Sequence, residues 1–436
     1  MKKNFLSAFL LLSTLLFTPV IAACGDDDEP VKNETPNQNQ NQNQNQNGNQ
    51  NQNQDTNPAP TPAPSENTPS NGDGVDMLLL NTRVVGMDIS MLPTYELQGA
   101  QYKDADGTAV SNVLAFLKSQ GFNAMRVRLF VDPARGQQDV SDGSSTQVVQ
   151  DLAYVKSLAR RIKQAGFYFL LDFHYSDSWA DPSKQWTPAA WLSLTDAQLE
   201  QKVYDYTKDC LQQLTDAGAA PDYIQTGNEI SYGMLWGAKD TQANRCFTNS
   251  DDASWNRFTR LLKQAGRACR EVCPKAPVIL HSERVEKPNV LIDFFNRMER
   301  AEVDYNIIGL SYYPYFHGSL ESLQAAVNQL SASRPTKKIH IVETGYAYKW
   351  AVGGTTFDYS NVYPLTAEGG KQFTLDLIKK LKNFDAVNGL YWWHGEANAF
   401  GCKGTMSEGW YNASLFDNST GKALPALSTM KTFLED

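Results

Sequence analysis

The sequence has no long run of basic residues. Its 39 Lys and Arg are outnumbered by 48 Asp and Glu, which gives a formal net charge of −9. Proteins that neutralise a phosphate backbone or hold an anionic membrane surface need clustered positive charge. We therefore expect no nucleic acid partner and no electrostatic attachment to a membrane.

Metal and nucleotide motifs are also missing. The chain has six Cys and five His, and Cys269 and Cys273 lie four residues apart without a second ligand pair to complete a zinc site. No glycine-rich phosphate loop follows the first expected strand. A doubly wound open sheet, which is the alternative to the barrel predicted below, therefore has no nucleotide-binding motif to support it. No internal repeat is present.

The first residues have the features of an export signal. Lys2 and Lys3 precede an apolar run over residues 5–20 that is too short to span a membrane comfortably, so we expect a signal peptide over residues 1–23. The sequence Ile21-Ala22-Ala23-Cys24 resembles a bacterial lipobox, which predicts a lipid on Cys24. The alternative is an ordinary signal peptide with an incidental cysteine.

An acidic stretch over residues 25–29 resembles the signal that sends some lipoproteins of Gram-negative bacteria to the cell surface. The expected location is thus the outer membrane, with surface exposure and the lipid as the only membrane contact. Residues 24–75 are rich in Asn, Gln and Pro, with too little apolar area to fold, and we interpret them as a flexible linker before a catalytic domain over residues 76–436. An odd number of cysteines follows Cys24, so at least one thiol stays unpaired within the chain: Cys210, Cys246, Cys269, Cys273 and Cys402.

Short apolar runs alternate with amphipathic helical stretches throughout the expected domain. This alternation is typical of repeated βα units around a parallel sheet. Eight runs have the length of strands, which predicts a closed (β/α)8 TIM barrel with long loops. The runs cover residues 84–89, 124–130, 168–173, 223–225, 278–281, 307–312, 339–342 and 390–393, and residues 148–165 and 373–381 are two of the expected helices.

Polar and aromatic residues collect where these runs end, which is the face on which barrels of this kind build active sites. A single Asp or His there is as easily a hydrogen-bonded rim residue. The whole set has few structural explanations: Asp88, Arg126, Arg128, Asp172, His174, Tyr175, Asp177, Asn228, Glu229, His281, Tyr312, Tyr313, Glu343, Trp392, Trp393 and His394.

Two carboxylates stand out in this set. Glu229 follows Thr226-Gly227-Asn228 at the end of the fourth expected strand, Glu343 follows Ile339-His340-Ile341-Val342 at the end of the seventh, and the barrel aims both side chains inward. Hydrolysis of a glycosidic bond with retention needs one protonated and one ionised carboxyl group about 5 Å apart. The sequence thus predicts that Glu229 and Glu343 form the catalytic pair.

Several motifs in order along the chain resemble glycoside hydrolase family 53, the endo-β-1,4-galactanases of clan A. The resemblance extends from about residue 84 to residue 427. The motifs are Gly86-Met87-Asp88-Ile89-Ser90, Arg126-Val127-Arg128-Leu129-Phe130, Asp172-Phe173-His174-Tyr175-Ser176-Asp177-Ser178-Trp179, Gly227-Asn228-Glu229-Ile230, Gly233-Met234-Leu235-Trp236, Ser311-Tyr312-Tyr313-Pro314 and Glu343-Thr344-Gly345-Tyr346.

The resemblance implies a retaining hydrolase that cuts β-1,4-galactan, with Glu229 as acid/base and Glu343 as nucleophile. It implies that Asn228 hydrogen-bonds the sugar 2-hydroxyl and places Asp88 among the substrate-binding residues.

The resemblance also implies that Arg128, His174 and Tyr313 position the nucleophile and the sugar, with Arg128 favouring the ionised form of Glu343. The neighbouring Arg126 and Tyr312 are the alternatives for the inward positions.

Tryptophans near the run ends predict an aromatic sugar-binding cleft, because aromatic faces stack on pyranose rings. The candidates are Trp179, Trp236, Trp350, Trp393 and Trp410. Trp393 and Trp236 are preferred as substrate-binding residues, while any of the others can equally fill space between barrel and helices.

The expected chemistry needs no cofactor. Some members of the family carry structural calcium in a late loop, and here the loop over residues 395–411 offers Glu396, Asn398 and Glu408 without a regular ligand spacing, so no metal ligands are assigned. We expect a monomer that binds galactan. The remaining alternatives are another clan enzyme acting on mannan, xylan or cellulose, and a surface lipoprotein that binds glycan without cutting it.

Overall fold

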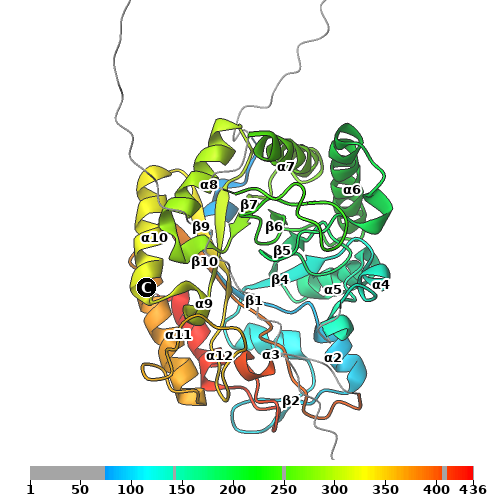
Figure 1. Ribbon diagram of the computed structural model, residues 1–436. Coiled ribbons are helices and arrows are strands. Elements are labelled where there is room, and N and C mark those ends of the chain that lie inside the picture. Colours follow the sequence, from blue (N-terminus) through cyan, green and yellow to red (C-terminus); the bar gives the residue numbers. More distant parts are fainter. Residues whose placement is uncertain (1–73, 141–143, 248–251, 405–409, 436) are drawn as a thin grey trace, which may run out of the picture. The chain divides into compact units, whose positions relative to one another are not determined.

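Eight parallel strands close into a barrel in the order β1-β10-β9-β8-β7-β6-β5-β4 (Figure 1). Each strand pairs with a neighbour on both sides, so the sheet has no edge and the open doubly wound alternative is excluded. The predicted (β/α)8 barrel is confirmed. The strands are β1 (Val84–Asp88), β4 (Ala124–Leu129), β5 (Tyr168–Phe173), β6 (Tyr223–Thr226), β7 (Val278–Ser282), β8 (Ile307–Tyr312), β9 (Lys338–Thr344) and β10 (Val387–Trp392).

The computed structural model describes residues 74–140, 144–247, 252–404 and 410–435. The predicted signal peptide, the predicted lipidation site Cys24 and nearly all of the predicted linker lie outside the described residues. They remain predictions.

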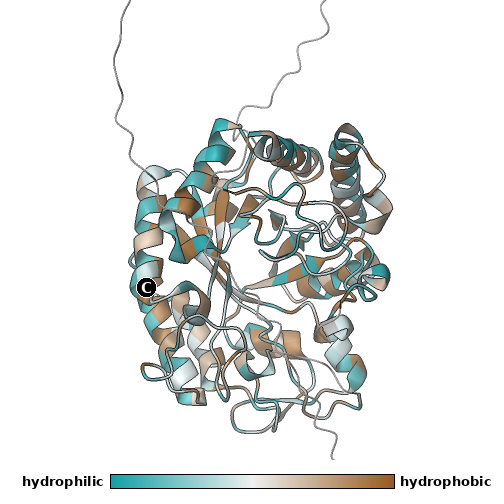
Figure 2. Cartoon of the chain, in the orientation of Figure 1, coloured by the Kyte–Doolittle hydropathy of each residue, from teal (hydrophilic) through white to brown (hydrophobic). Residues whose placement is uncertain are grey.

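Helices surround the barrel and bury one face each against it. Helix α6 begins with a capping box, in which Thr195 Oγ1 accepts the Gln198 backbone N–H and the Gln198 side chain accepts the Thr195 backbone N–H. Figure 2 shows hydrophobic and hydrophilic residues alternating around such helices, as expected for amphipathic elements. The helices that lie between successive barrel strands include α3 (Val113–Ser119), α5 (Leu152–Gln164), α6 (Asp196–Asp216), α7 (Asp252–Val272), α8 (Pro288–Arg300), α10 (Leu320–Ser333) and α11 (Ala367–Leu381).

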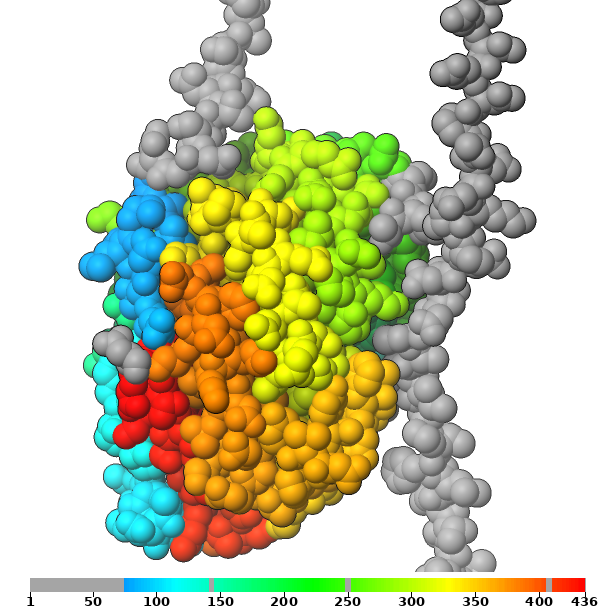
Figure 3. Space-filling model, turned by 90° about the vertical axis from the view of Figure 1, so that its left-hand side faces the viewer, coloured from blue at the N-terminus to red at the C-terminus, as the bar shows by residue number. Residues whose placement is uncertain are grey.

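Short helices fill the loops and ends: α1 (Met77–Asn81), α2 (Leu92–Gln98), α4 (Pro133–Gly136), α9 (Pro314–His317) and α12 (Pro425–Thr429). Figure 3 shows α10, α11 and the last residues side by side on one face, next to the first described residues. A two-stranded hairpin, β2 (Tyr102–Lys103) with β3 (Ala109–Val110), was not anticipated from the sequence.

The amino-terminal end of the barrel is closed by apolar side chains and by α1. Asp76 caps α1 by accepting two backbone N–H groups. The Tyr223 hydroxyl then donates to the carbonyl of Leu79 at 2.9 Å, and Asn388 donates to the carbonyl of Leu80 at 2.8 Å. These bonds attach α1 to the amino-terminal end of the barrel. The predicted site residues lie at the opposite end.

The middle of the barrel is crowded around one histidine. Burial lowers the pKa of His340 to about 3, so its ring is neutral. A Cβ on Gly389 would lie 2.2 Å from this ring, and one on Gly86 would lie 2.5 Å from the carbonyl oxygen of Ala124. Glycine at both positions is therefore a requirement of packing.

No helix among the described residues is long and apolar enough to cross a membrane. Cys210, Cys269, Cys273 and Cys402 have free thiols, and the first three of these are buried. This agrees with the prediction that at least one thiol is unpaired.

Candidate active site

A layer of buried polar side chains lies inside the barrel near the carboxyl ends of the strands. Strand pairing places Asp88 beside Arg126, and Arg128 beside Asp172. Because alternate residues of a strand face the same side, seven of the strands contribute inward polar positions, and β4 contributes two of them at different depths. Its members on the strands are Asp88, Arg126, Arg128, Asp172, Gln225, His281, Ser311 and Glu343.

Glu343 lies on β9 with both carboxylate oxygens engaged. Arg126 Nη2 is 3.0 Å from Oε1, and the Tyr313 hydroxyl donates to Oε2 at 3.1 Å. The residue is 5% exposed. A buried carboxylate held by a guanidinium and a phenol is oriented toward one position above it and can act there as a nucleophile.

Glu229 follows β6 in a turn with a left-handed backbone, φ +48°. Ser311 Oγ donates to its Oε1 at 2.6 Å, and the same hydroxyl lies 3.5 Å from Oε2 of Glu343. One serine hydroxyl thus lies within hydrogen-bonding range of both carboxylates, which brings together the two glutamates predicted from the sequence.

The surroundings of the two glutamates separate their pKa values. Burial, followed by the negative charge of Glu343, raises the pKa of Glu229 well above its ordinary value. Burial also raises the pKa of Glu343, to about 7, while the Arg126 guanidinium and the Tyr313 hydrogen bond oppose the rise. Glu343 therefore loses its proton first, so one carboxyl group of the pair ionises while the other stays protonated.

Arg128 was predicted to favour the ionised form of Glu343, but the arginine that contacts Glu343 and lowers its pKa is the alternative, Arg126. Residues two apart on a strand face the same side, so both arginines point inward, and Arg126 lies one layer deeper than Arg128. Arg128 Nη1 instead lies 3.2 Å from Asp88 and 3.3 Å from His394 Nε2, with its guanidinium 4.5 Å from the ring centre of Trp179.

Asp88 is fully buried between the two arginines, with Oδ2 3.3 Å from Arg126 and Oδ1 3.2 Å from Arg128. Its carboxylate holds the arginines in place. A direct contact of Asp88 with a sugar, as the sequence predicted, is not supported by this arrangement.

Asn228 and His174 both join the site as predicted, each tied to the loop after β5. Asn228 Nδ2 donates to the Ala180 carbonyl at 2.9 Å, and its Oδ1 accepts from Arg126 Nη2 at 2.9 Å. His174 Nδ1 accepts the Ala180 backbone N–H at 3.1 Å, and its Nε2 lies 3.1 Å from Asp172. Nδ1 as an acceptor leaves the proton on Nε2, facing Asp172.

Aromatic rings border the two glutamates. Trp393 stacks on His394 with ring centres 4.5 Å apart and meets Trp179 at 6.1 Å. On the other side Trp410 lies 5.2 Å from Tyr313, the residue that contacts Glu343. The prediction that Tyr313 rather than Tyr312 faces the site is confirmed, since the Tyr312 hydroxyl donates to the Gly318 carbonyl instead.

The predicted role of Trp236 as a sugar platform is wrong, because its ring is fully buried. Its indole N–H donates to the Tyr232 carbonyl at 2.9 Å, and the Arg245 guanidinium lies 5.2 Å from its ring centre. Trp350, by contrast, is 50% exposed.

Three residues of the site were not singled out from the sequence. Ser311 bridges the glutamates, Gln225 donates to Asp172 at 2.6 Å, and Gln185 donates to the backbone carbonyl of Asn228 at 2.8 Å. Counting inward positions along each strand finds Ser311 and Gln225. Gln185 lies in a loop, where no such period applies.

No group of three or more His, Cys, Asp or Glu that could hold a metal ion occurs among the described residues. In the late loop, Glu396 Oε1 accepts the Met91 backbone N–H and Asn398 Oδ1 accepts the Phe400 N–H, while Glu408 lies outside the described residues. Calcium binding by this loop remains untested.

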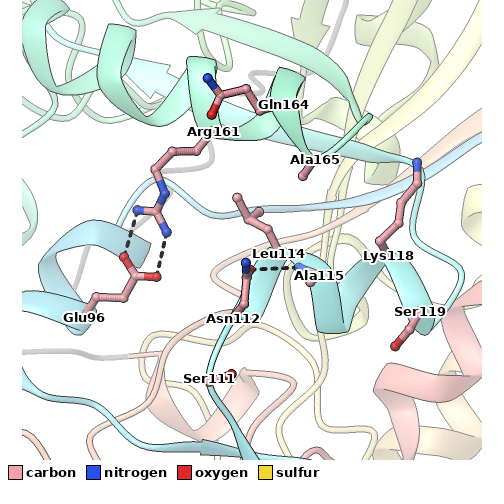
Figure 4. A pocket seen from close by; sticks show the side chains of 10 residues that line it. All are labelled: Glu96, Ser111, Asn112, Leu114, Ala115, Lys118, Ser119, Arg161, Gln164 and Ala165. Atoms are coloured by element: carbon pink, nitrogen blue, oxygen red, sulfur yellow. Dashed lines mark hydrogen bonds and ion pairs between the residues drawn. The ribbon is translucent and has the colours of Figure 1, made fainter.

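A separate cavity of about 750 Å³ lies outside the barrel, between α2, α3 and α5 (Figure 4). Its polar wall includes the ion pair of Arg161 with Glu96 at 2.7 Å. None of the predicted site residues lines it, so it is not part of the candidate active site.

A closed parallel barrel that brings two glutamates together at the carboxyl ends of its strands is the arrangement of a glycoside hydrolase. Comparison with known proteins agrees: residues 84–430 match the sequence profile of glycosyl hydrolase family 53. The chain belongs to this family and is a glycoside hydrolase.

Relatives and solved structures share both sequence and fold with the chain. An arabinogalactan endo-β-1,4-galactanase of Cellvibrio japonicus is 32% identical over 364 residues, covering 80% of this chain and 90% of the relative. A family 53 catalytic domain from Ignisphaera aggregans is 31% identical with a TM-score of 0.68, covering 80% of this chain and 96% of that one. A fungal β-1,4-galactanase is 26% identical with a TM-score of 0.64, covering 80% and 98%.

Proposed function

We propose that this protein is an endo-acting β-1,4-galactanase that cleaves its polymer with retention, with Glu229 as acid/base and Glu343 as nucleophile. The observation that carries the proposal is the Ser311 hydroxyl within 3.5 Å of both carboxylates. A retaining mechanism needs the two carboxyl groups about 5–5.5 Å apart, whereas an inverting one needs about 6.5–9.5 Å to admit a water. A single hydroxyl within hydrogen-bonding range of both carboxylates therefore favours retention. The names of the relatives support galactan as the polymer.

In the first step the Glu343 carboxylate attacks the anomeric carbon of the galactosyl unit. The glycosidic C–O bond breaks, and Glu229 donates its proton to the departing oxygen. Arg126 and Tyr313 hold the attacking carboxylate in position through their contacts with its two oxygens.

In the second step Glu229, now ionised, takes a proton from a water molecule. The water oxygen attacks the anomeric carbon, the ester to Glu343 breaks, and the sugar leaves with its original configuration. Glu343 loses its negative charge when the ester forms in the first step and regains it in the second. Because this charge raises the pKa of Glu229, Glu229 favours its acid form while Glu343 is ionised and gives up its proton more easily once the ester has formed.

The test is cleavage of linear β-1,4-galactan beside mannan, xylan and cellulose by a protein comprising residues 76–436. Galactan-only release of reducing ends with rapid loss of viscosity is expected. Glu343→Ala removes the activity, and Glu229→Ala loses it on galactan but, on substrates with an activated leaving group, keeps the first step, seen as a burst of leaving group followed by slow turnover. Activity on mannan, xylan or cellulose instead would assign another clan enzyme, and binding without cleavage would assign a glycan-binding protein.

We further propose that the protein is exported and anchored to the outer membrane through a lipid on Cys24, with residues 24–75 as a spacer. The lipobox-like sequence and the polar composition of the spacer support this. Labelling of the full chain with a radioactive fatty acid tests it. Label that Cys24→Ala removes supports the anchor, and a soluble, unlabelled full chain contradicts it.

A further inference from the structure

The turn that carries Glu229 is held in a backbone conformation that non-glycine residues rarely adopt, φ +48°. On one side His281 Nδ1 accepts the Glu229 backbone N–H at 3.2 Å and the His281 carbonyl accepts the Ile230 N–H at 3.0 Å. Burial lowers the pKa of His281 well below its ordinary value, which keeps Nδ1 free of an added proton and able to accept. The acid/base therefore depends on β7 for its position.

A third glutamate lies at the end of the same strand. Glu283 follows Ser282, is 5% exposed, and accepts a hydrogen bond at Oε1 from the hydroxyl of Ser231, two residues beyond Glu229. Its Oε2 is buried and has no hydrogen-bond partner among the described residues. A buried, half-satisfied carboxyl group costs stability, and the two-step reaction above makes no use of it.

We propose that Glu283 is a positioning residue for the acid/base: through Ser231 it fixes the turn that presents Glu229, and its negative charge opposes the loss of the Glu229 proton. This inference rests on the proposed function, because it deepens the role of the same site.

The charges around Glu229 come from several elements. Apart from burial, Glu343 and then Glu283 raise its pKa, and Asp181 in the loop after β5 adds to them, while the Ser311 hydrogen bond lowers it. Asp181 is paired with Lys184 at 3.3 Å, so its charge is partly compensated. The facing ionisable groups are Glu343 on β9, Glu283 after β7, Asp181 after β5, neutral His281 on β7 and Tyr313 after β8.

Glu283 has its own neighbours, Arg284 and Glu286. Burial raises the pKa of Glu283 to about 7, with Arg284 and the Ser231 hydrogen bond opposing the rise and Glu286 adding to it. Glu283 thus becomes charged near neutral pH, in the range where Glu343 has ionised and Glu229 must still hold its proton. Its charge extends the acid form of Glu229 to higher pH.

Two variants separate the charge from the hydrogen bond. Glu283→Gln keeps an oxygen for Ser231 and removes the charge, so the basic limb of kcat/KM on galactan should move to lower pH by about one unit. Ser231→Ala removes the hydrogen bond and keeps the Glu283 carboxyl group, whose charge then forms at higher pH because the bond lowers its pKa. The variant should lower kcat/KM on galactan about tenfold or more, yet change kcat/KM less than about twofold on dinitrophenyl β-galactobioside, because this parameter reports the first step and the leaving group needs no protonation.

Glu286→Gln is the matched control, because it removes a neighbouring charge that makes no bond to the turn. It should leave the basic limb in place. An unchanged pH profile in Glu283→Gln overturns the proposal, as does an equal shift in Glu286→Gln or an equal loss on both substrates in Ser231→Ala. Activity on the dinitrophenyl substrate reports that each variant is folded.

Failure of the proposed function is distinguishable from these outcomes. If the unaltered protein cuts another glycan and not galactan, the substrate assignment fails, and the same comparison on that glycan still tests Glu283.

Discussion

Arg126, rather than Arg128, should set the pH at which the enzyme becomes active. Its Nη2 lies 3.0 Å from Glu343 with neither side chain more than 6% exposed, so solvent screens the pair weakly. An opposite charge at this distance lowers a carboxyl pKa by about 1–3 units. Replacing Arg126 by Met should raise the Glu343 pKa by that amount from its value of about 7.

The proposed reaction needs Glu343 ionised, so the acid limb of kcat/KM should move to higher pH in Arg126→Met. Below the pKa the ionised fraction falls tenfold for each unit, and kcat/KM at pH 6 should therefore fall by about tenfold to a thousandfold. The assay is the pH profile of reducing-end release from galactan. Arg128→Met should keep its acid limb, because Arg128 contacts Asp88 and His394 and not Glu343.

Arg126→Met also removes one buried ion-pair partner each from Asp88 and Asp172, which keep their contacts with Arg128 and His174, so the loss of stability should be at most about 3–5 kcal/mol. Circular dichroism checks that the variant is folded, and Arg126→Lys, which keeps the charge, should show the smaller shift. The reasoning is refuted if the acid limb moves in Arg128→Met and not in folded Arg126→Met.

Three further predictions concern packing, pH and sugar binding. Gly389→Ala places a Cβ 2.2 Å from the His340 ring and should lower the free energy of unfolding by about 1–3 kcal/mol or more. Gly370→Ala, whose Cβ meets nothing within 4 Å, should raise it by about 0.5–1 kcal/mol. Urea unfolding measures both values, and equal effects would contradict the packing argument. Glu396 has a folded-state pKa of about 7 against an ordinary 4.5, so its contribution to stability is full below about pH 4.5 and is lost as pH rises through 7. Glu396→Gln should therefore weaken the fall in Tm between pH 5 and pH 8, and an unchanged slope would contradict this. Trp393→Ala should raise KM for galactan about tenfold with a smaller change in kcat, and an unchanged KM would remove Trp393 from the cleft.

The barrel could be predicted from sequence because its strands are short, apolar and separated by helical periods. Two predicted runs, 168–173 and 307–312, coincide with β5 and β8, while the run predicted over 339–342 extends in the structure to Lys338–Thr344. The extension carries Glu343 into the strand, past a register shift between β8 and β9. A bulge of this kind has no signal in apolar periodicity. The β2–β3 hairpin escaped prediction because its strands are two residues long.

The glutamate pair could be predicted because both residues lie at the carboxyl ends of strands, Glu343 within β9 and Glu229 in the turn after β6, and barrel geometry directs such positions to one shared site. Choosing between Arg126 and Arg128 failed because both face inward, and their depth depends on strand stagger, which the sequence does not encode locally. The prediction that Trp236 binds the sugar was wrong for a different reason. Its burial beneath Arg245 depends on the fold of a long loop, which no periodic pattern describes.

The most direct test of the proposed mechanism is to trap its covalent intermediate. The protein is incubated with a fluorinated galactobioside that forms the glycosyl ester quickly and releases it slowly, then digested and analysed by mass spectrometry. The account predicts that the peptide containing Glu343 gains the mass of the sugar, and that Glu343→Gln gains none. A label on a different carboxylate, or no label together with hydrolysis that inverts the anomeric configuration, would contradict it.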